Sequence, residues 1–198
     1  MPRTTRSAVP RYRLSITLDE IAPTIWRRFW IPGNRSLIAL HHTIQAVMGW
    51  TDAHLHEFQI AGVRYATPDP DDNPDAVVVD ERQTLLHKAL NGISRFGYLY
   101  DFGDGWQHTL IVEDVQPLHD EDAAYAYIDA GARACPPEDA GGVTGYQGFL
   151  DQLAKNPKSR QVREFLRWAG EDFDPDRFDR HAANATLLRM AWSGWGSK

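Results

Sequence analysis

Residues 98–108, with the sequence YLYDFGDGWQH, predict the β-hairpin around which the rest of the chain is arranged. An aromatic strand runs into a tight turn, and a second apolar strand follows it. A two-residue turn at 104–105 would be of type I′ and one at 103–104 of type II′, because both types need the positive φ that Gly and Asp tolerate. Since side chains alternate along strands, either turn places three residues on one face of the sheet: Asp101, Trp106 and His108. A bulge or a three-residue loop would break this shared face.

The composition is that of an ordinary globular protein, since 42% of the 198 residues are hydrophobic and 24% are charged. The single cysteine, Cys135, excludes an internal disulfide and suits a reducing compartment, so we expect a cytoplasmic protein. No apolar run approaches the roughly 20 residues of a membrane span, and we expect neither a membrane anchor nor a signal peptide. A net charge of −6 disfavours general nucleic-acid binding, which depends on a dominant positive field.

The order of the remaining elements predicts an α+β fold with a mixed, largely antiparallel sheet. An early packed helix is expected over 37–48, with Ser36 as its N-cap and Gly49 at its end. The expected strands are 11–18, 25–31, 54–60 and 77–79, with an edge strand at 124–128. A short helix capped by Thr84 is expected over 84–90, and a C-terminal group of three helices over 144–155, 159–169 and 175–190. We expect a single domain over 10–190 and a disordered tail at 1–9.

Two histidine-containing patterns on strands are candidates for chemistry. Asp101 could orient His108 for acid–base work or metal ligation, although a cross-strand polar pair also satisfies a half-buried histidine without any chemistry. The pair His54-x-His56 places two imidazoles on the same face of a strand, which is a spacing that metal sites use. His41 or His108 could supply a third imidazole.

The segment 135–142, CPPEDAGG, predicts a rigid, shaped loop, because its prolines fix φ and its glycines allow tight backbone turns. It presents the Cys135 thiol together with the carboxylates of Glu138 and Asp139. A lone cysteine is more often a small buried hydrophobe than a nucleophile. The two carboxylates could equally cap the helix expected to begin near Thr144.

Several separated motifs together resemble the Ri-plasmid Orf-3-like proteins. They are Pro23-x-Ile25-Trp26-Arg27-Arg28, Leu37-x-x-Leu40-His41-x-x-Ile44-Gln45, His54-Leu55-His56-x-Phe58, Tyr100-Asp101-Phe102-Gly103-Asp104-x-Trp106-x-His108 and Cys135-Pro136-Pro137-Glu138-Asp139-x-Gly141-Gly142. The resemblance covers about residues 11–190 and implies an α+β domain of undetermined biochemical function. Some relatives carry a transposon-resolvase label. A serine resolvase needs a nucleophilic serine among arginines and a basic DNA-binding helix-turn-helix, so this acidic chain makes resolvase chemistry the least favoured reading.

Two main hypotheses about function follow, and a third possibility is a domain that binds a nucleic acid or a protein partner through a local patch. The first is a binding or accessory protein associated with mobile elements, which holds a protein or small-molecule partner in a pocket walled by Trp26, Trp50 and Trp106. The second is a metal-dependent hydrolase or nuclease in which Zn²⁺ or Mn²⁺ activates a water molecule. The candidate pocket residues are His41, His54, His56, Asp101, Asp104, Trp106, His108, Cys135, Glu138 and Asp139. The candidate metal ligands among them are His54, His56, Asp101 and His108.

Overall fold

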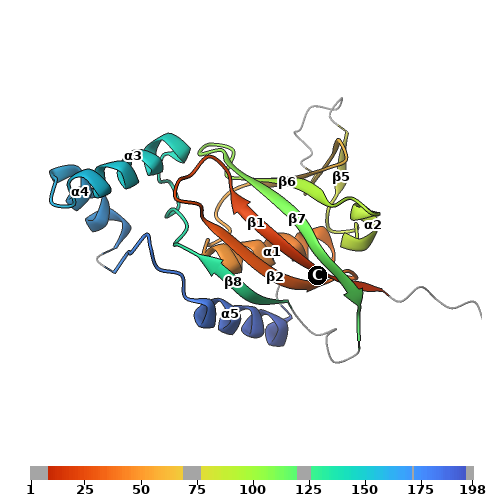
Figure 1. The fold of residues 1–198 in the computed structure, drawn as a ribbon. Helices are drawn as coiled ribbons and strands as arrows, with labels where there is room; N and C mark the ends of the chain where they lie inside the picture. Colours follow the sequence, from red (N-terminus) through yellow and green to blue (C-terminus); the bar gives the residue numbers. More distant parts are fainter. Residues whose placement is uncertain (1–8, 69–76, 120–125, 171, 195–198) are drawn as a thin grey trace, which may run out of the picture.

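An eight-stranded sheet with the strand order β5-β4-β3-β6-β7-β1-β2-β8 forms the centre of the protein (Figure 1). The structure is a computed structural model and describes residues 9–68, 77–119, 126–170 and 172–194. Neighbouring strands are antiparallel except for β4 and β5, which run parallel. The prediction of an α+β fold with a mixed, largely antiparallel sheet is therefore confirmed. The strands are β1 Pro10–Leu18, β2 Trp26–Pro32, β3 His56–Ile60, β4 Val63–Ala66, β5 Val78–Asp80, β6 Arg95–Tyr100, β7 Trp106–Pro117 and β8 Tyr127–Ala132.

Strand β1 sits between β7 and β2, and its side chains alternate strictly between a buried and a more exposed face. Leu14, Ile16 and Leu18 point into the core, as the sequence alternation predicts. Helix α1, Leu37–Met48, packs against the sheet and buries Leu40 and Ile44. The hydrophobic core lies between the buried face of this sheet and helix α1, and residues of the later helices, such as Tyr146 and Leu187, extend it.

Helix α1 begins and ends where its sequence predicts. The Ser36 side chain accepts a hydrogen bond from the backbone N–H of Ala39, which satisfies one of the open donors of the first turn. Gly49 ends the helix with a φ of 97°, a conformation that costs a residue without Cβ little.

The central hairpin differs from its prediction in the length of its loop. Tyr98 lies opposite His108 and Tyr100 opposite Trp106, so the loop contains residues 101–105. A five-residue loop takes Asp101 out of the strand, and Asp101 does not share a face with Trp106 and His108. The reason is local: Asp101 adopts a left-handed φ of 56° and its side chain accepts hydrogen bonds from the backbone N–H groups of Gly103 and Asp104. Such an Asx-type turn competes successfully with the two-residue turns.

The remaining helices are α2 Leu86–Leu90, α3 Gly142–Lys155, α4 Arg160–Ala169 and α5 Arg180–Ser193. Helix α5 begins five residues later than predicted, because Asp179 rather than Asp174 is its N-cap and accepts a hydrogen bond from Ala182 N. Thr84 is not the cap of α2, whose N-cap is Leu85. Figure 1 shows α3 and α4 at one end of the molecule and α5 beside β8.

Other boundaries differ from the predictions as well. Helix α3 starts at Gly142 instead of near Thr144. Strand β3 starts at His56, so His54 lies in the segment that leads into it. The edge strand is β8, Tyr127–Ala132, and residues 124–125 of its predicted range lie outside the described residues. The predicted tail also lies outside them except for Val9, whose carbonyl accepts a hydrogen bond from Leu118 N. None of the described helices is both long and apolar enough to cross a bilayer.

Candidate metal centre

Four of the predicted site residues converge at the end of the hairpin, and we call them the His54 cluster: His54, Asp101, Glu138 and Asp139. The Nε2 atom of His54 lies 3.4 Å from Asp139 Oδ1, 3.6 Å from Asp101 Oδ2 and 3.8 Å from Glu138 Oε2. This nitrogen is buried, yet it has no hydrogen-bond partner. The cluster brings together segments that lie far apart in the sequence.

The turn of the hairpin orients the Asp101 carboxylate. Its Oδ1 accepts hydrogen bonds from Gly103 N at 2.9 Å and from Asp104 N at 3.2 Å. The backbone N–H of Asp101 donates to Leu55 O, which fixes the loop beside the segment that carries His54. Because Oδ1 is occupied, Oδ2 is the atom presented to His54. Hydrogen bonds of this kind commonly orient metal-ligating carboxylates.

Glu138 is held by residues that the sequence did not single out as site residues. Its Oε1 accepts hydrogen bonds from Thr51 N, Thr51 Oγ1 and the hydroxyl of Tyr100. Burial raises the pKa of Tyr100 and the nearby Glu138 carboxylate raises it further, so the hydroxyl keeps its proton and donates it. The alternation along β6 could have pointed to Tyr100, because it places this residue and Tyr98 on the same buried face.

The loop 135–142 is docked onto the hairpin loop. Asp104 Oδ2 accepts a hydrogen bond from Gly141 N at 3.1 Å, and the indole N–H of Trp50 donates to Pro136 O at 2.9 Å. Gly142 has a φ of 64°, and a Cβ added there would lie 2.5 Å from Asp104 O. The approach of the two loops therefore requires glycine at this position. The Asp104 side chain is not a member of the His54 cluster, but it positions the loop that carries Glu138 and Asp139 through its hydrogen bond with the Gly141 backbone.

The charge of the His54 cluster is unbalanced. Three carboxylates surround one imidazole, and no lysine or arginine in the described part of the chain forms an ion pair with any of the three. Atoms that share one tetrahedral Zn²⁺ at about 2.0–2.2 Å lie about 3.3–3.6 Å from one another. The separations around His54 Nε2 are close to this range. One nitrogen and several carboxylate oxygens form a donor set that suits Zn²⁺ or Mn²⁺.

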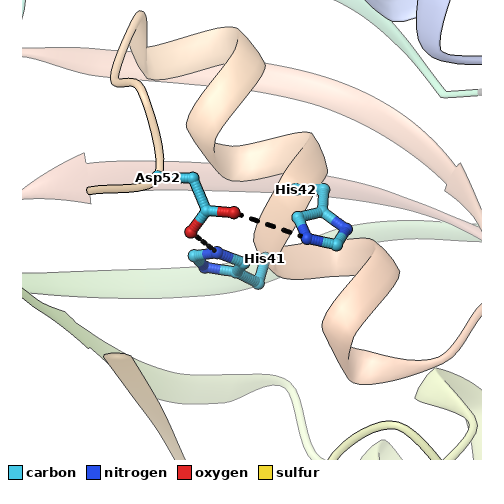
Figure 2. A group of neighbouring side chains, drawn as sticks. All are labelled: His41, His42 and Asp52. Atoms are coloured by element: carbon cyan, nitrogen blue, oxygen red, sulfur yellow. Dashed lines mark hydrogen bonds and ion pairs between the residues drawn. The ribbon is translucent and has the colours of Figure 1, made fainter. Parts of the chain in front are cut away.

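A second group, His41, His42 and Asp52, also lies close enough to share an ion. Figure 2 shows the Asp52 carboxylate between the two imidazoles, with one oxygen toward each ring. His41 Nε2 lies 2.7 Å from Asp52 Oδ1, and His42 Nε2 lies 3.6 Å from Asp52 Oδ2. The distance between His41 Nε2 and Asp52 Oδ1 is that of a hydrogen bond.

His41 belongs to a closed ring of hydrogen bonds that we call the His41 network: His41, Gln45, Asp52 and Tyr98. Gln45 accepts from Asp52 N at 3.0 Å and donates to the Tyr98 hydroxyl at 3.1 Å. The hydroxyl is 2.8 Å from His41 Nδ1. The assignment that satisfies every group has Tyr98 donating to Nδ1 and Nε2–H donating to Asp52. Since both nitrogens of His41 have partners, this network is structural.

Burial keeps the imidazole of His41 neutral. It lowers the pKa of His41 to about 4, although the hydrogen bond to Asp52 opposes this change. The ring of His56 stacks on His41 with a centroid distance of 3.4 Å, and its Nε2 lies 2.9 Å from the buried carboxylate of Glu81. Thus His54 and His56 belong to different clusters, and the prediction that they share one site is wrong.

His108 and Trp106 belong to the core beside the cluster. His108 Nδ1 donates to Tyr98 O at 3.2 Å, and burial lowers its pKa to about 4. Its ring packs edge-on against Trp50 and has no contact with Asp101, so the predicted Asp101–His108 pair is wrong. The ring centroids of Trp50 and Trp106 are 6.5 Å apart and both rings are buried in the core, whereas Trp26 lies beneath the guanidinium of Arg28. A pocket walled by these three tryptophans stays a prediction.

Cys135 points away from the carboxylates that follow it in the sequence. Its Sγ accepts a hydrogen bond from Arg27 at 3.4 Å and lies 3.7 Å from Met48 Sδ. Burial raises the pKa of this thiol, although the charge of Arg27 opposes the change. The thiol therefore stays protonated, which does not favour a nucleophilic role.

Comparison with known proteins shows that most of the chain matches one protein family. Residues 10–182 match the family model described as "Plasmid pRiA4b ORF-3-like protein". The chain belongs to the plasmid pRiA4b ORF-3-like family. This confirms the resemblance that the sequence motifs indicate.

The chain is similar to two further proteins over most of its length. The uncharacterized protein y4hQ of Sinorhizobium fredii is 38% identical over 183 residues, which are 90% of this chain and 89% of that protein. The crystal structure of MM3350 from Methanosarcina mazei Go1, a protein of unknown function, has a TM-score of 0.75 at 35% identity. The match covers 88% of this chain and 97% of the archaeal one. Neither description names a ligand or a reaction.

Proposed function

We propose that this ORF-3-like protein binds a divalent cation, Zn²⁺ or Mn²⁺, at the His54 cluster. The observation that carries the proposal is the buried His54 Nε2, which faces three carboxylates without making a hydrogen bond to any of them. A buried polar atom without a partner calls for an explanation, and a bound ion is one of the explanations that apply. A cation at the centre would accept the lone pair of Nε2 and balance the carboxylates.

The surroundings of the cluster support this role. Asp101 Oδ1 and both carboxylate oxygens of Glu138 already accept hydrogen bonds, so these two side chains would lose little conformational freedom on binding. Asp139 is the exposed member, with a side chain 75% accessible. The cation would therefore enter from the side of Asp139 and remain in contact with solvent there.

A direct test is titration of the full-length, chelator-treated protein with Zn²⁺ and Mn²⁺ by calorimetry. We expect one cation per chain for the wild type and a loss of at least about tenfold in affinity for His54→Ala. His181→Ala is the matched control, because His181 is exposed at the start of α5 and should leave binding unchanged. Equal affinities for the two variants, or no binding by the wild type, would refute the proposal.

The open side of the cluster favours metal-assisted hydrolysis as a second candidate function. Catalytic metal sites keep a coordination position for water, whereas structural zinc sites are closed by four protein ligands. The exposed Asp139 leaves room for such a position. Turnover of bis(p-nitrophenyl) phosphate or p-nitrophenyl acetate that requires the cation, is lost in His54→Ala and persists in His181→Ala would establish this function. Cation binding without turnover of either would favour a binding or accessory protein, and an association with mobile elements stays a prediction.

A further inference from the structure

A second candidate site lies on the opposite side of the same loop. A cavity of about 450 Å³ opens between the end of α1, the segment 134–137 and the start of α5, and we call it the Arg27 cavity. Its walls include Arg27, Met48, Cys135, Phe173, Phe178 and Ala182. The volume is within the range of pockets that hold small organic ligands. Cys135 and the two prolines after it line this cavity, while the next two residues belong to the His54 cluster.

The polar feature of the cavity is the guanidinium of Arg27, a residue only 1% exposed. Its Nε donates to Val47 O, and one terminal nitrogen donates to Trp26 O and Ala132 O, each at 2.8 Å. The other terminal nitrogen donates only to Cys135 Sγ, at 3.4 Å. A thiol is a weak acceptor, and a terminal guanidinium nitrogen carries two hydrogens. At least one donor position therefore has no strong partner.

The charge of Arg27 also has no counter-ion. No carboxylate among the described residues lies within 4.0 Å of this guanidinium, although buried charges in proteins are normally paired. Asp179, at the rim, uses one oxygen to cap α5 and lies 3.7 Å from the exposed Arg177. Phe178 covers one face of the guanidinium at 3.9 Å, which leaves the edge of the group for a ligand.

The absence of a side chain at Gly131 leaves room for Phe178 to stack on the Arg27 guanidinium. A Cβ there would lie 2.7 Å from the Phe178 ring and 2.8 Å from Arg27 Cδ, so a larger residue would displace the pair. The stacked Arg27 and Phe178 are thus built into the cavity wall. Arginine is well suited to carboxylates, because its planar fork matches their two oxygens.

We propose that the Arg27 cavity binds a small organic carboxylate with an apolar body. The carboxylate would accept hydrogen bonds from the terminal nitrogen of Arg27 and from the Cys135 thiol, and the apolar body would lie against Met48 and Phe173. This site is separate from the His54 cluster and does not depend on a cation there.

The test compares benzoate with benzamide, which has nearly the same shape but no charge. Each is titrated at millimolar concentrations into ¹⁵N-labelled full-length protein in the presence of EDTA, and the Arg27 Nε–H resonance is followed by NMR. We expect benzoate to shift this resonance and benzamide to bind at least about tenfold more weakly. Equal binding of the two compounds, or binding of neither, would overturn the proposal, and EDTA keeps this outcome independent of the His54 cluster.

Variants locate the bound benzoate. Arg27→Gln should weaken binding at least about tenfold, but it also removes hydrogen bonds that hold α1 and β8. Ala182→Phe is the second variant, because it adds a ring at the cavity wall and leaves Arg27 and its hydrogen-bond acceptors unsubstituted; Ala185→Phe on the exposed side of α5 is its control. Loss of binding in Ala182→Phe with retention in Ala185→Phe supports the site. Unchanged affinity in Ala182→Phe would show that benzoate binds elsewhere and would refute it.

Discussion

Replacing Tyr98 by phenylalanine tests the distinction between the structural His41 network and the His54 cluster. The substitution removes one oxygen and leaves Gln45 Nε2 without its acceptor and His41 Nδ1 without its partner. Both of these residues are buried, with exposed fractions of 1% and 0%. Each buried polar group left without a partner costs about 1–3 kcal/mol. We therefore expect Tyr98→Phe to lower the free energy of unfolding by about 3 kcal/mol, a value in the lower part of the summed range.

For a chain of this length that loss lowers the melting temperature by about 6–12 °C, measurable by calorimetry and by urea denaturation. Tyr65→Phe is the control, because Tyr65 is partly exposed and its hydroxyl has no hydrogen bond to the described residues; its effect should stay within about 0.5 kcal/mol. Equal losses for the two variants would refute the closed hydrogen-bond ring.

Three further predictions follow from single residues. Burial lowers the pKa of His108 to about 4 from its ordinary 6.5, so the neutral imidazole contributes fully to folding stability above pH 6.5 and this contribution is lost as the pH falls toward 4. Between pH 7 and pH 4 the free energy of unfolding of the wild type should therefore fall by about 3 kcal/mol more than that of His108→Gln, measured by urea denaturation. An equal fall for the two proteins would contradict this. Gly142→Ala should destabilise the protein by about 1–3 kcal/mol because of its φ and the contact with Asp104, whereas Gly148→Ala, with open space around its Cβ position, should not. Asp139→Asn should reduce the affinity for Mn²⁺ in calorimetry, and an unchanged affinity would remove this exposed carboxylate from the proposed ligands.

Much of the fold could be predicted from the sequence, because its signals are local. Ser36 and Gly49 mark the ends of α1 through capping and a left-handed φ, and both lie where the sequence indicates. Side-chain alternation assigns the buried face of β1 correctly. The sequence prediction failed at the hairpin loop, where the side-chain hydrogen bonds of Asp101 stabilise a five-residue loop over the two-residue turns that Asp-Gly favours.

The candidate site was predictable as a set of residue types but not as a cluster. His54, Asp101 and Glu138 all lie in loops at strand or helix ends, and which loops meet depends on the strand order β3-β6-β7 and on the docking of 135–142. No local pattern encodes that contact. Conversely, the local pattern His54-x-His56 predicted one site for both imidazoles. The structure places them in different clusters, because β3 begins only at His56 and His54 lies before the strand.

Anomalous diffraction can show where the protein holds a bound cation. Crystals grown with Zn²⁺ or Mn²⁺ and measured at the absorption edge of the metal would give its position by anomalous diffraction. We expect one strong peak about 2.0–2.2 Å from His54 Nε2, with Asp101 and Asp139 among the oxygen ligands. A peak between His41, His42 and Asp52 instead, or no peak at His54 with the cation in excess, would contradict it.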